Sequence, residues 1–267
     1  MARAATLLII AGSDSGAGAG IQADLKSASA RGVYAATAIT AITAQNTLGV
    51  QAVETLSPGL VAAQIQSVLT DIGADAVKIG MLGSAGIVEA VAGALDGYAG
   101  PVVLDPVMVA KSGDPLLPDA AIAALRDRLL PRTTVLTPNL PEAAKLLGGA
   151  PATTPEDVVQ QGEALRAFGP QAVLMKGGHA EGETCRDLLV HEGDPVTLEA
   201  PRIATRNTHG TGCSLASALA AELAKGVDIE TAARRAHGWL QGAIAAADGL
   251  GIGRGHGPVH HFHGIWS

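Results

Sequence analysis

Aromatic residues and positive charge are both scarce in this sequence. Phe, Trp and Tyr together make up 2% of the 267 residues, and the formal net charge is −7 at pH 7. A nucleic-acid partner needs a basic surface for its phosphates, and a single strand also needs aromatic faces on which its bases stack. We therefore expect no nucleic acid among the partners of this chain.

Cysteine is almost absent as well. The two cysteines, Cys185 and Cys213, lie far apart in the sequence, and no CxxC pair occurs. This usage does not indicate a disulfide framework and is typical of a reducing compartment. We expect a cytoplasmic protein, and at this point we assign no role to Cys185.

A hydrophobic run that could cross a membrane is also missing. The uncharged segment 32–53 comes closest, but its Thr, Gln and Asn side chains would need hydrogen-bond partners inside lipid. The apolar run at 6–10 leads directly into glycines and then into Asp24 and Lys26, so it fits a buried strand better than a signal peptide. We expect no membrane partner.

What the sequence does have is a regular alternation of two kinds of segment. Short runs rich in β-branched residues predict buried strands near 6–10, 77–81, 101–107, 134–139 and 172–178. Apolar residues that recur every three or four positions predict helices over 59–72, 86–95, 121–130, 156–168 and 229–248. Residues 185–193 and 195–203 fit a short hairpin. Thr154 and Pro155 have the residue types of a helix start.

Buried strands separated by helices predict a mostly parallel sheet in a layered α/β fold. No linker rich in Gly, Ser or Pro divides the chain, so we predict one domain over residues 1–267. Ligands of such sheets bind beyond the carboxyl ends of the strands. The polar or sulfur-containing residues that end the predicted strands are Asp14, Met81, Asp105, Asn139 and Lys176.

The first glycine turn, GSDSGAGAGIQADLK, matches neither common nucleotide fingerprint. Counted from Gly16 and Gly18, the last glycine of a dinucleotide loop is replaced by Ile21, and no lysine follows where a Walker loop requires one. The turn either packs a helix closely on a strand, or it brings Asp24 to a ligand amine as a hydrogen-bond acceptor. Both interpretations stay open.

A second turn of small residues, NTHGTGCSLASA, precedes a strongly helical run. The amides of Gly210, Thr211 and Gly212 can converge on an anion at the helix N-terminus, as a transferred phosphoryl group requires. The helix dipole also favours a thiolate, so we expect a lowered pKa for Cys213 and a role as base for a substrate hydroxyl. The alternative is a small cysteine buried in a helix cap.

Two further segments are compatible with phosphoryl transfer. Asn139 and Glu142 are spaced to hold Mg²⁺ through waters at a strand-to-helix turn, although Glu142 also fits an acid that stabilises the helix dipole. Lys176 ends a buried strand before two glycines, where it would meet a nucleotide phosphate better than solvent. A carboxylate as deep as Asp105 needs a metal, a water or a cationic partner.

With these segments the chain resembles the ribokinase-like superfamily and, within it, the hydroxymethylpyrimidine/phosphomethylpyrimidine kinases of thiamine biosynthesis. The similar segments span nearly the whole chain: GSDSGAGAGIQADLK, ITAQNTLGVQ, KIGML, VVLDPVMVAKSGDPLL, TPNLPEA, LMKGGH, NTHGTGCSLASA and GPVHHF. The resemblance implies a three-layer α/β/α fold with a mostly parallel central sheet and a short flap that contains Lys111 and Ser112. It also implies a homodimer.

The resemblance implies ATP-dependent phosphorylation of 4-amino-5-hydroxymethyl-2-methylpyrimidine, first to the monophosphate and then to the diphosphate. Cys213 would be the base, and the amides of Gly210, Thr211 and Gly212 would hold the transferred group. The substrate residues would be Gly12, Asp24, Gln45, Met81 and Val107. Lys176 and Asn139 would bind ATP, and Asp105 and Glu142 would bind Mg²⁺. The resemblance admits a monovalent cation, whose requirement the sequence does not decide.

Other interpretations are retained at this stage. A pyridoxal kinase would use the same scaffold, although Asp24 with Gln45 suits the ring amine of a pyrimidine. A non-catalytic pyrimidine or nucleotide sensor is the alternative from another class. The tail histidines, His256, His260, His261 and His263, lack the spacing of a zinc site, so we expect a structural or dimer-contact role. Ala17 replaces a family glycine, which stiffens the first turn without removing a functional atom.

Overall fold

The computed structural model describes residues 3–109, 117–178 and 182–266. Lys111 and Ser112 of the expected flap lie outside the described residues. No helix within the described part of the chain is long and apolar enough to cross a bilayer.

A nine-stranded sheet with the order β3-β2-β1-β4-β5-β6-β7-β8-β9 forms the centre of the fold. The five pairs from β2-β1 to β6-β7 are parallel, and the three pairs at the two edges are antiparallel. The prediction of a mostly parallel sheet is therefore confirmed. The strands are β1 Thr6–Asp14, β2 Tyr34–Asn46, β3 Gly49–Thr55, β4 Ala76–Ile79, β5 Val102–Leu104, β6 Val135–Leu136, β7 Ala172–Met175, β8 Thr184–Val190 and β9 Val196–Pro201.

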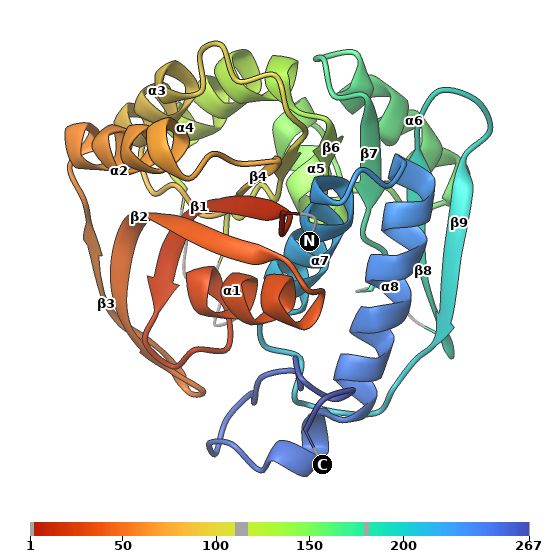
Figure 1. Ribbon diagram of the computed structural model, residues 1–267. Coiled ribbons are helices and arrows are strands. Elements are labelled where there is room, and N and C mark those ends of the chain that lie inside the picture. The colour runs from red at the N-terminus through yellow and green to blue at the C-terminus, as the bar shows by residue number, and fades with distance from the viewer. Residues whose placement is uncertain (1–2, 110–116, 179–181, 267) are drawn as a thin grey trace.

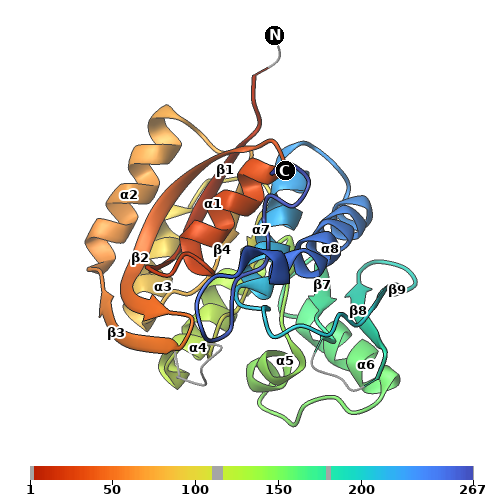
Figure 2. The same cartoon turned by 90° about the horizontal axis from the view of Figure 1, so that it is seen from below.

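Helices cover both faces of the sheet, and each face has its own apolar core (Figures 1 and 2). One layer consists of α1 Gly20–Ala30, α7 Thr211–Ala224 and α8 Ile229–Ala245. The other consists of α2 Pro58–Asp71, α3 Ala85–Ala94, α4 Asp119–Ala124, α5 Leu140–Leu147 and α6 Pro155–Arg166. This arrangement confirms the expected three-layer α/β/α fold.

The predicted helix starts and the predicted hairpin have clear physical causes in the structure. The Thr154 side chain accepts a hydrogen bond from the Asp157 amide, and Asp157 in turn caps the Thr154 amide, so α6 begins with a capping box. Strands β8 and β9 pair antiparallel as the predicted hairpin and extend the sheet beyond β7. The helix expected over 121–130 begins as α4 and continues as a π-helical turn over Leu125–Leu129.

The uncharged segment 32–53, for which no strand was predicted, forms β2 and most of β3. The two strands pair antiparallel, from Ala41 opposite Thr55 to Asn46 opposite Gly49. Many β3 side chains are exposed on both faces, so the segment lacks the buried apolar run by which the central strands were identified.

The short central strands place their following residues at one edge of the sheet. β5 ends one residue before Asp105, β7 ends one residue before Lys176, and β1 ends at Asp14. Because parallel strands share a carboxyl edge, these side chains come together there, as the strand-end prediction required.

Candidate active site

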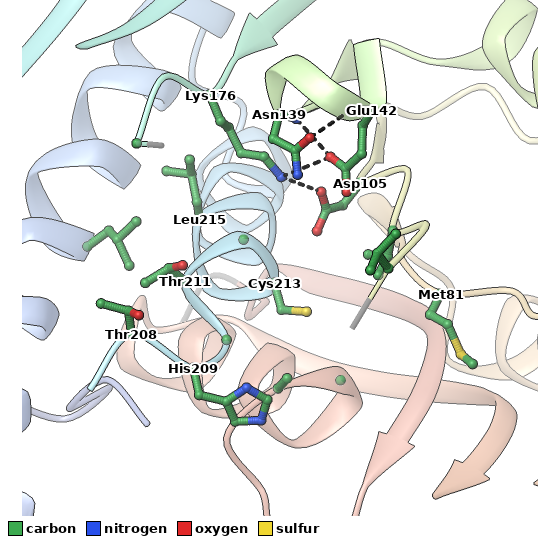
Figure 3. A pocket seen from close by; sticks show the side chains of 18 of the residues that line it. Met81, Asp105, Asn139, Glu142, Lys176, Thr208, His209, Thr211, Cys213 and Leu215 are labelled. Atoms are coloured by element: carbon green, nitrogen blue, oxygen red, sulfur yellow. Dashed lines mark hydrogen bonds and ion pairs between the residues drawn. The ribbon is translucent and has the colours of Figure 1, made fainter. Parts of the chain in front are cut away.

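A cavity of about 710 Å³ lies at the carboxyl edge of the sheet. Figure 3 shows Asp105, Glu142 and Lys176 converging on one side of this cavity, with the Cys213 sulfur directed into the space between them and Met81. The predicted site residues that line it are Gly12, Gln45, Met81, Asp105, Val107, Asn139, Glu142, Lys176, Gly210, Thr211, Gly212 and Cys213. The structure therefore brings together all the predicted site residues except Asp24.

The turn before α7 requires glycine for two different reasons. Gly210 has a φ of 81°, and a Cβ at this position would lie 1.8 Å from the carbonyl oxygen of Gly18. A side chain here would be strained by its backbone conformation and would also push the first glycine turn away. Gly210 thus lets the turns at 16–19 and 208–213 pack against each other.

Gly212 brings the turn close to the charged cluster. A Cβ at Gly212 would lie 3.3 Å from Lys176 Nζ and 3.5 Å from Asp105 Oδ2. The absence of a side chain leaves the start of α7 within reach of both charges. The helix N-terminus, a lysine and a carboxylate therefore border the same small volume, which suits an anion that carries a metal ion.

Lys176 is held by two carboxylates. Its Nζ lies 2.8 Å from Asp105 Oδ1 and 3.8 Å from Glu142 Oε2. Burial alone would lower the pKa of Lys176, but the charges of Asp105 and Glu142 outweigh it and raise this pKa above the usual lysine value. Lys176 is therefore charged at neutral pH and suited to bind phosphate oxygens.

Asn139 and Glu142 form a capping box at the start of α5. The Glu142 amide donates to Asn139 Oδ1 at 2.8 Å, and the Asn139 amide donates to Glu142 Oε2 at 2.8 Å. The helix-cap interpretation of Glu142 is therefore confirmed, and the same carboxylate also faces Lys176. Burial raises the pKa of Glu142, and the charge of Lys176 opposes that rise.

The donor set fits a hard divalent cation. Asp105 is 1% exposed and Glu142 is 8% exposed. Asp105 uses Oδ1 for Lys176, while its Oδ2 faces the Gly212 turn. Carboxylate oxygens beside a phosphate-binding turn are the ligands that Mg²⁺ takes in nucleotide sites, together with waters and substrate oxygens.

The expected role of Asp24 requires correction. Its carboxylate is fully buried outside the cavity lining and accepts hydrogen bonds from Lys78 Nζ at 2.9 and 2.8 Å and from Ser217 Oγ at 2.7 Å. A carboxylate enclosed by these donors does not reach a ligand amine. The packing of α1 on α7 and the Lys78 side chain from β4 determine this position, and the one-dimensional spacing did not reveal it.

The expected ionisation of Cys213 is also wrong. Burial is the largest influence and raises the pKa of Cys213 to about 12, with a smaller lowering effect from the positive charge of Lys78. The charges of Asp24 and Asp105 raise this pKa further, and a hydrogen bond from the backbone of Gly20 lowers it. The helix dipole alone does not decide the ionisation, because the sulfur lies among buried charges of both signs.

Two polar residues that received no role connect the glycine turns. Asp14 accepts hydrogen bonds from the amides of Gly16, Gly18 and Ala19, and its Oδ2 lies 2.9 Å from His209 Nε2. His209 in turn lies 3.4 Å from the Gln45 side-chain nitrogen. The position of Asp14 at a strand end was a usable signal, whereas the pairing with His209 spans 195 positions and leaves no local trace.

The family model for phosphomethylpyrimidine kinase matches residues 14–260. The chain belongs to this family. It is 52% identical over 260 residues to hydroxymethylpyrimidine/phosphomethylpyrimidine kinase of Escherichia coli (strain K12), covering 97% of this chain and 98% of the relative. It is 46% identical over 262 residues to a chloroplastic thiamine biosynthetic bifunctional enzyme of Arabidopsis thaliana, covering 97% of this chain and 50% of that enzyme.

The fold of this kinase is similar to that of a solved pyridoxal kinase. The ADP complex of the Bacillus subtilis pyridoxal kinase superposes with a TM-score of 0.91 at 36% identity, covering 99% of this chain and 100% of that one. The ribokinase-like fold that the sequence segments suggested is thereby confirmed.

Proposed function

We propose that this kinase phosphorylates 4-amino-5-hydroxymethyl-2-methylpyrimidine with ATP and then phosphorylates the resulting monophosphate to the diphosphate, in thiamine biosynthesis. Family membership and the names of the relatives support this activity. The observation on which this proposal depends is that Gly212, at the N-terminus of α7, lies close to both Lys176 and Asp105. A sensor without catalysis would not need a lysine, two carboxylates and a cysteine at one point of a cavity.

In the first step, we assign the acceptor role to the hydroxymethyl oxygen. It attacks the γ-phosphorus of ATP while the bond from that phosphorus to the bridging oxygen breaks and ADP leaves. The hydroxyl proton passes to the thiolate of Cys213. The amides at 210–213 stabilise the negative charge on the transferred group, and Lys176 neutralises the phosphates. Asn139 lies beside Lys176 as a further nucleotide contact.

We assign Asp105 and Glu142 to Mg²⁺. The ion would supply charge neutralisation for the transferring phosphoryl group, and its charge would offset the carboxylates that oppose ionisation of Cys213. Rates measured with Mg²⁺ in either potassium or sodium buffer decide whether a monovalent cation is also required.

The second step uses a different nucleophile. Its attacking oxygen belongs to a phosphate monoester, whose second pKa of about 6 leaves it already deprotonated at neutral pH. A protein base has no proton to remove from such an oxygen. Cys213 should therefore matter for the first phosphorylation and much less for the second.

For the pyrimidine ring, we retain Gln45 as the polar contact, Met81 and Val107 as the apolar walls, and Gly12 as a backbone contact. A carboxamide carries both a donor and an acceptor, which matches a ring nitrogen beside a ring amine. Because Asp24 does not line the cavity, we assign this discrimination to Gln45. The similarity to a pyridoxal kinase gives a reason to test pyridoxal as a competing substrate.

We also propose a cytoplasmic homodimer. Ile42, Leu48 and Val53 on the β2–β3 hairpin are 50%, 66% and 42% exposed, and β3 is the edge strand of the sheet. An apolar edge of this kind is suited to association with a second copy. Light scattering should give twice the 26.7 kDa chain mass, and Val53→Lys should reduce it to the monomer mass. A monomeric parent protein would contradict this assembly.

The experiment that tests the activity is ³¹P NMR of the protein with ATP, Mg²⁺ and the hydroxymethylpyrimidine. A new phosphomonoester signal followed by a diphosphate pair is expected. ATP consumption with pyridoxal but not with the pyrimidine would contradict the proposal and favour the pyridoxal kinase alternative.

A further inference from the structure

Lys78 is an unusual residue for the middle of a parallel sheet. It belongs to the four-residue strand β4, all of whose side chains are buried, and its own side chain is 0% exposed. An ammonium group placed so deeply needs a partner of opposite charge. The partner is Asp24 of α1, whose two carboxylate oxygens lie 2.9 and 2.8 Å from Lys78 Nζ.

The pair lies directly against the catalytic end of the cavity. Lys78 and Cys213 both line this cavity. Ser217, which donates to Asp24 Oδ1 at 2.7 Å, follows Cys213 by four positions on α7 and so occupies the same helix face one turn further along. The Lys78–Asp24 pair and Cys213 are therefore neighbours across one turn of α7.

The Lys78 ammonium has more N–H donors than the hydrogen bonds that it makes among the described residues. It has three N–H groups, and within the described residues its hydrogen bonds go to the two oxygens of Asp24. A Cβ at Gly80, the residue after β4, would lie 2.8 Å from Lys78 Nζ, so the ammonium lies close to this glycine and a side chain here would collide with it. The two hydrogen bonds to Asp24 hold the charge of the ammonium in place.

We propose that Lys78 is a positioning residue for the first phosphorylation: its fixed positive charge favours the thiolate of Cys213, and Asp24 holds it there. This inference rests on the proposed role of Cys213 as base. It explains why a charged pair occupies the sheet centre, where an apolar pair would pack without a desolvation penalty.

The charges that face Cys213 come from four directions. They are Lys78 on β4, Asp24 on α1, Asp105 after β5 and Lys176 after β7. Burial raises the pKa of the Cys213 thiol, and among the charges Lys78 is the main influence that lowers it. The charge of Asp24 raises it, so removal of Lys78 and removal of Asp24 should shift the pKa of the thiol in opposite directions.

The test is the rate of Cys213 alkylation by iodoacetamide at pH 8 and pH 9, followed by mass spectrometry in buffer without divalent cations. A Cys185→Ser background leaves Cys213 as the single thiol. Lys78→Met should slow the alkylation by about tenfold or more, and Asp24→Asn should accelerate it by a similar factor. Ser217→Ala is the matched control, since it alters the same network without changing a charge, and its rate should stay near the parent rate.

If the Lys78–Asp24 pair has only a structural role, we expect a different result. Both charge variants would then lose stability, and their alkylation rates would change in the same direction or stay at the parent rate; either result overturns the proposal. The double variant Lys78→Met/Asp24→Asn keeps the site neutral, and its rate should lie between those of the single variants. If a single variant fails to fold, a double-variant rate equal to that of the folded single variant overturns the proposal. Alkylation needs no turnover, so failure of Cys213 as base would appear separately, as undiminished first-step activity of Cys213→Ala.

Discussion

Cys213 is the residue on which the proposed chemistry depends most strongly. Its neighbours oppose each other: burial and the carboxylates of Asp24 and Asp105 disfavour the thiolate, while Lys78 and the Gly20 backbone favour it. A sulfur in this setting is protonated near neutral pH in the ligand-free protein. Once ionised, it is a strong base, because a high pKa accompanies high proton affinity.

The rate of the first phosphorylation should therefore rise with pH. Because the pKa of Cys213 is raised to about 12, the thiolate fraction grows with increasing pH throughout the neutral and mildly alkaline range. Each pH unit should increase the first-step rate by up to about tenfold while pH remains below that pKa. Single-turnover assays at pH 7, 8 and 9 measure this. A first-step rate that is flat across the range would contradict proton transfer to Cys213.

Gln45 provides a residue-scale test of substrate recognition. Gln45→Ala removes a polar partner worth about 1 kcal/mol, which corresponds to about a fivefold weaker affinity for the hydroxymethylpyrimidine. The affinity for ATP should stay unchanged, because Gln45 lies by His209 and not by Lys176. Isothermal titration calorimetry measures both ligands on one variant. Equal losses for the two would contradict the assignment of Gln45 to the pyrimidine.

Among the structural elements, the two glycine turns determine the shape of the site. The turn at 16–19 is held by hydrogen bonds from its amides to the Asp14 carboxylate. It contacts the turn at 208–213 where Gly18 lies against Gly210. Ala17 has a φ of 61°, in the left-handed region that favours glycine. The Ala17 methyl group therefore strains the backbone of this turn as well as stiffening it.

Replacing Ala17 with glycine should stabilise the protein slightly. A left-handed non-glycine residue is strained by about 1–2 kcal/mol, and the extra freedom of glycine in the unfolded chain offsets part of that gain. A net gain below about 1 kcal/mol would raise Tm by about 2 °C in a chain of this size. Differential scanning calorimetry measures the shift. A lower Tm for Ala17→Gly would show that the strain account of this turn is incorrect.

The sequence predicted the elements whose residues repeat regularly. The five central strands, the hairpin β8–β9 and the capped start of α6 follow from apolar runs and from residues such as Thr154. The hairpin β2–β3 was not assigned, because its exposed β3 gives no apolar run. Local patterns therefore determine the layers of the fold, and the pairing at an exposed edge depends on tertiary contacts.

Long-range packing limited prediction of the site in the same way. Lys176, Asp105 and the 210–213 turn were identified because each ends a strand or begins a helix. The position of Asp24 depends on Lys78, which is 54 residues away, and on Ser217, which is 193 residues away. A lysine inside an otherwise apolar strand was the one local sign that a buried carboxylate lay nearby.

At the scale of the whole molecule, the tail is joined to the active-site helix. His261 is buried, and its Nε2 lies 3.0 Å from Ser214 Oγ, the residue after Cys213. Its ring also lies 6.4 Å from that of Trp239 on α8. This geometry supports the structural role expected for the tail histidines in the case of His261.

Stability should fall on acidification because of this histidine. Burial lowers the pKa of His261 from 6.5 to about 3, so the unfolded chain binds a proton between these values that the folded protein does not. The contribution of His261 is present above pH 6.5 and is lost as pH falls toward 3. Urea unfolding at pH 7 and pH 5 should show a smaller loss of stability in His261→Gln than in the parent. Identical losses in both proteins would exclude His261 as the source.

The central claim is that Cys213, in the first turn of α7, removes the proton of the hydroxymethyl group. The most direct measurement is the separate single-turnover rate of each phosphorylation in the parent protein and in Cys213→Ala. The first rate should fall by about a hundredfold or more, the scale of a lost general base, while the second rate changes little. A first rate like that of the parent, or equal losses in both steps, would contradict the claim.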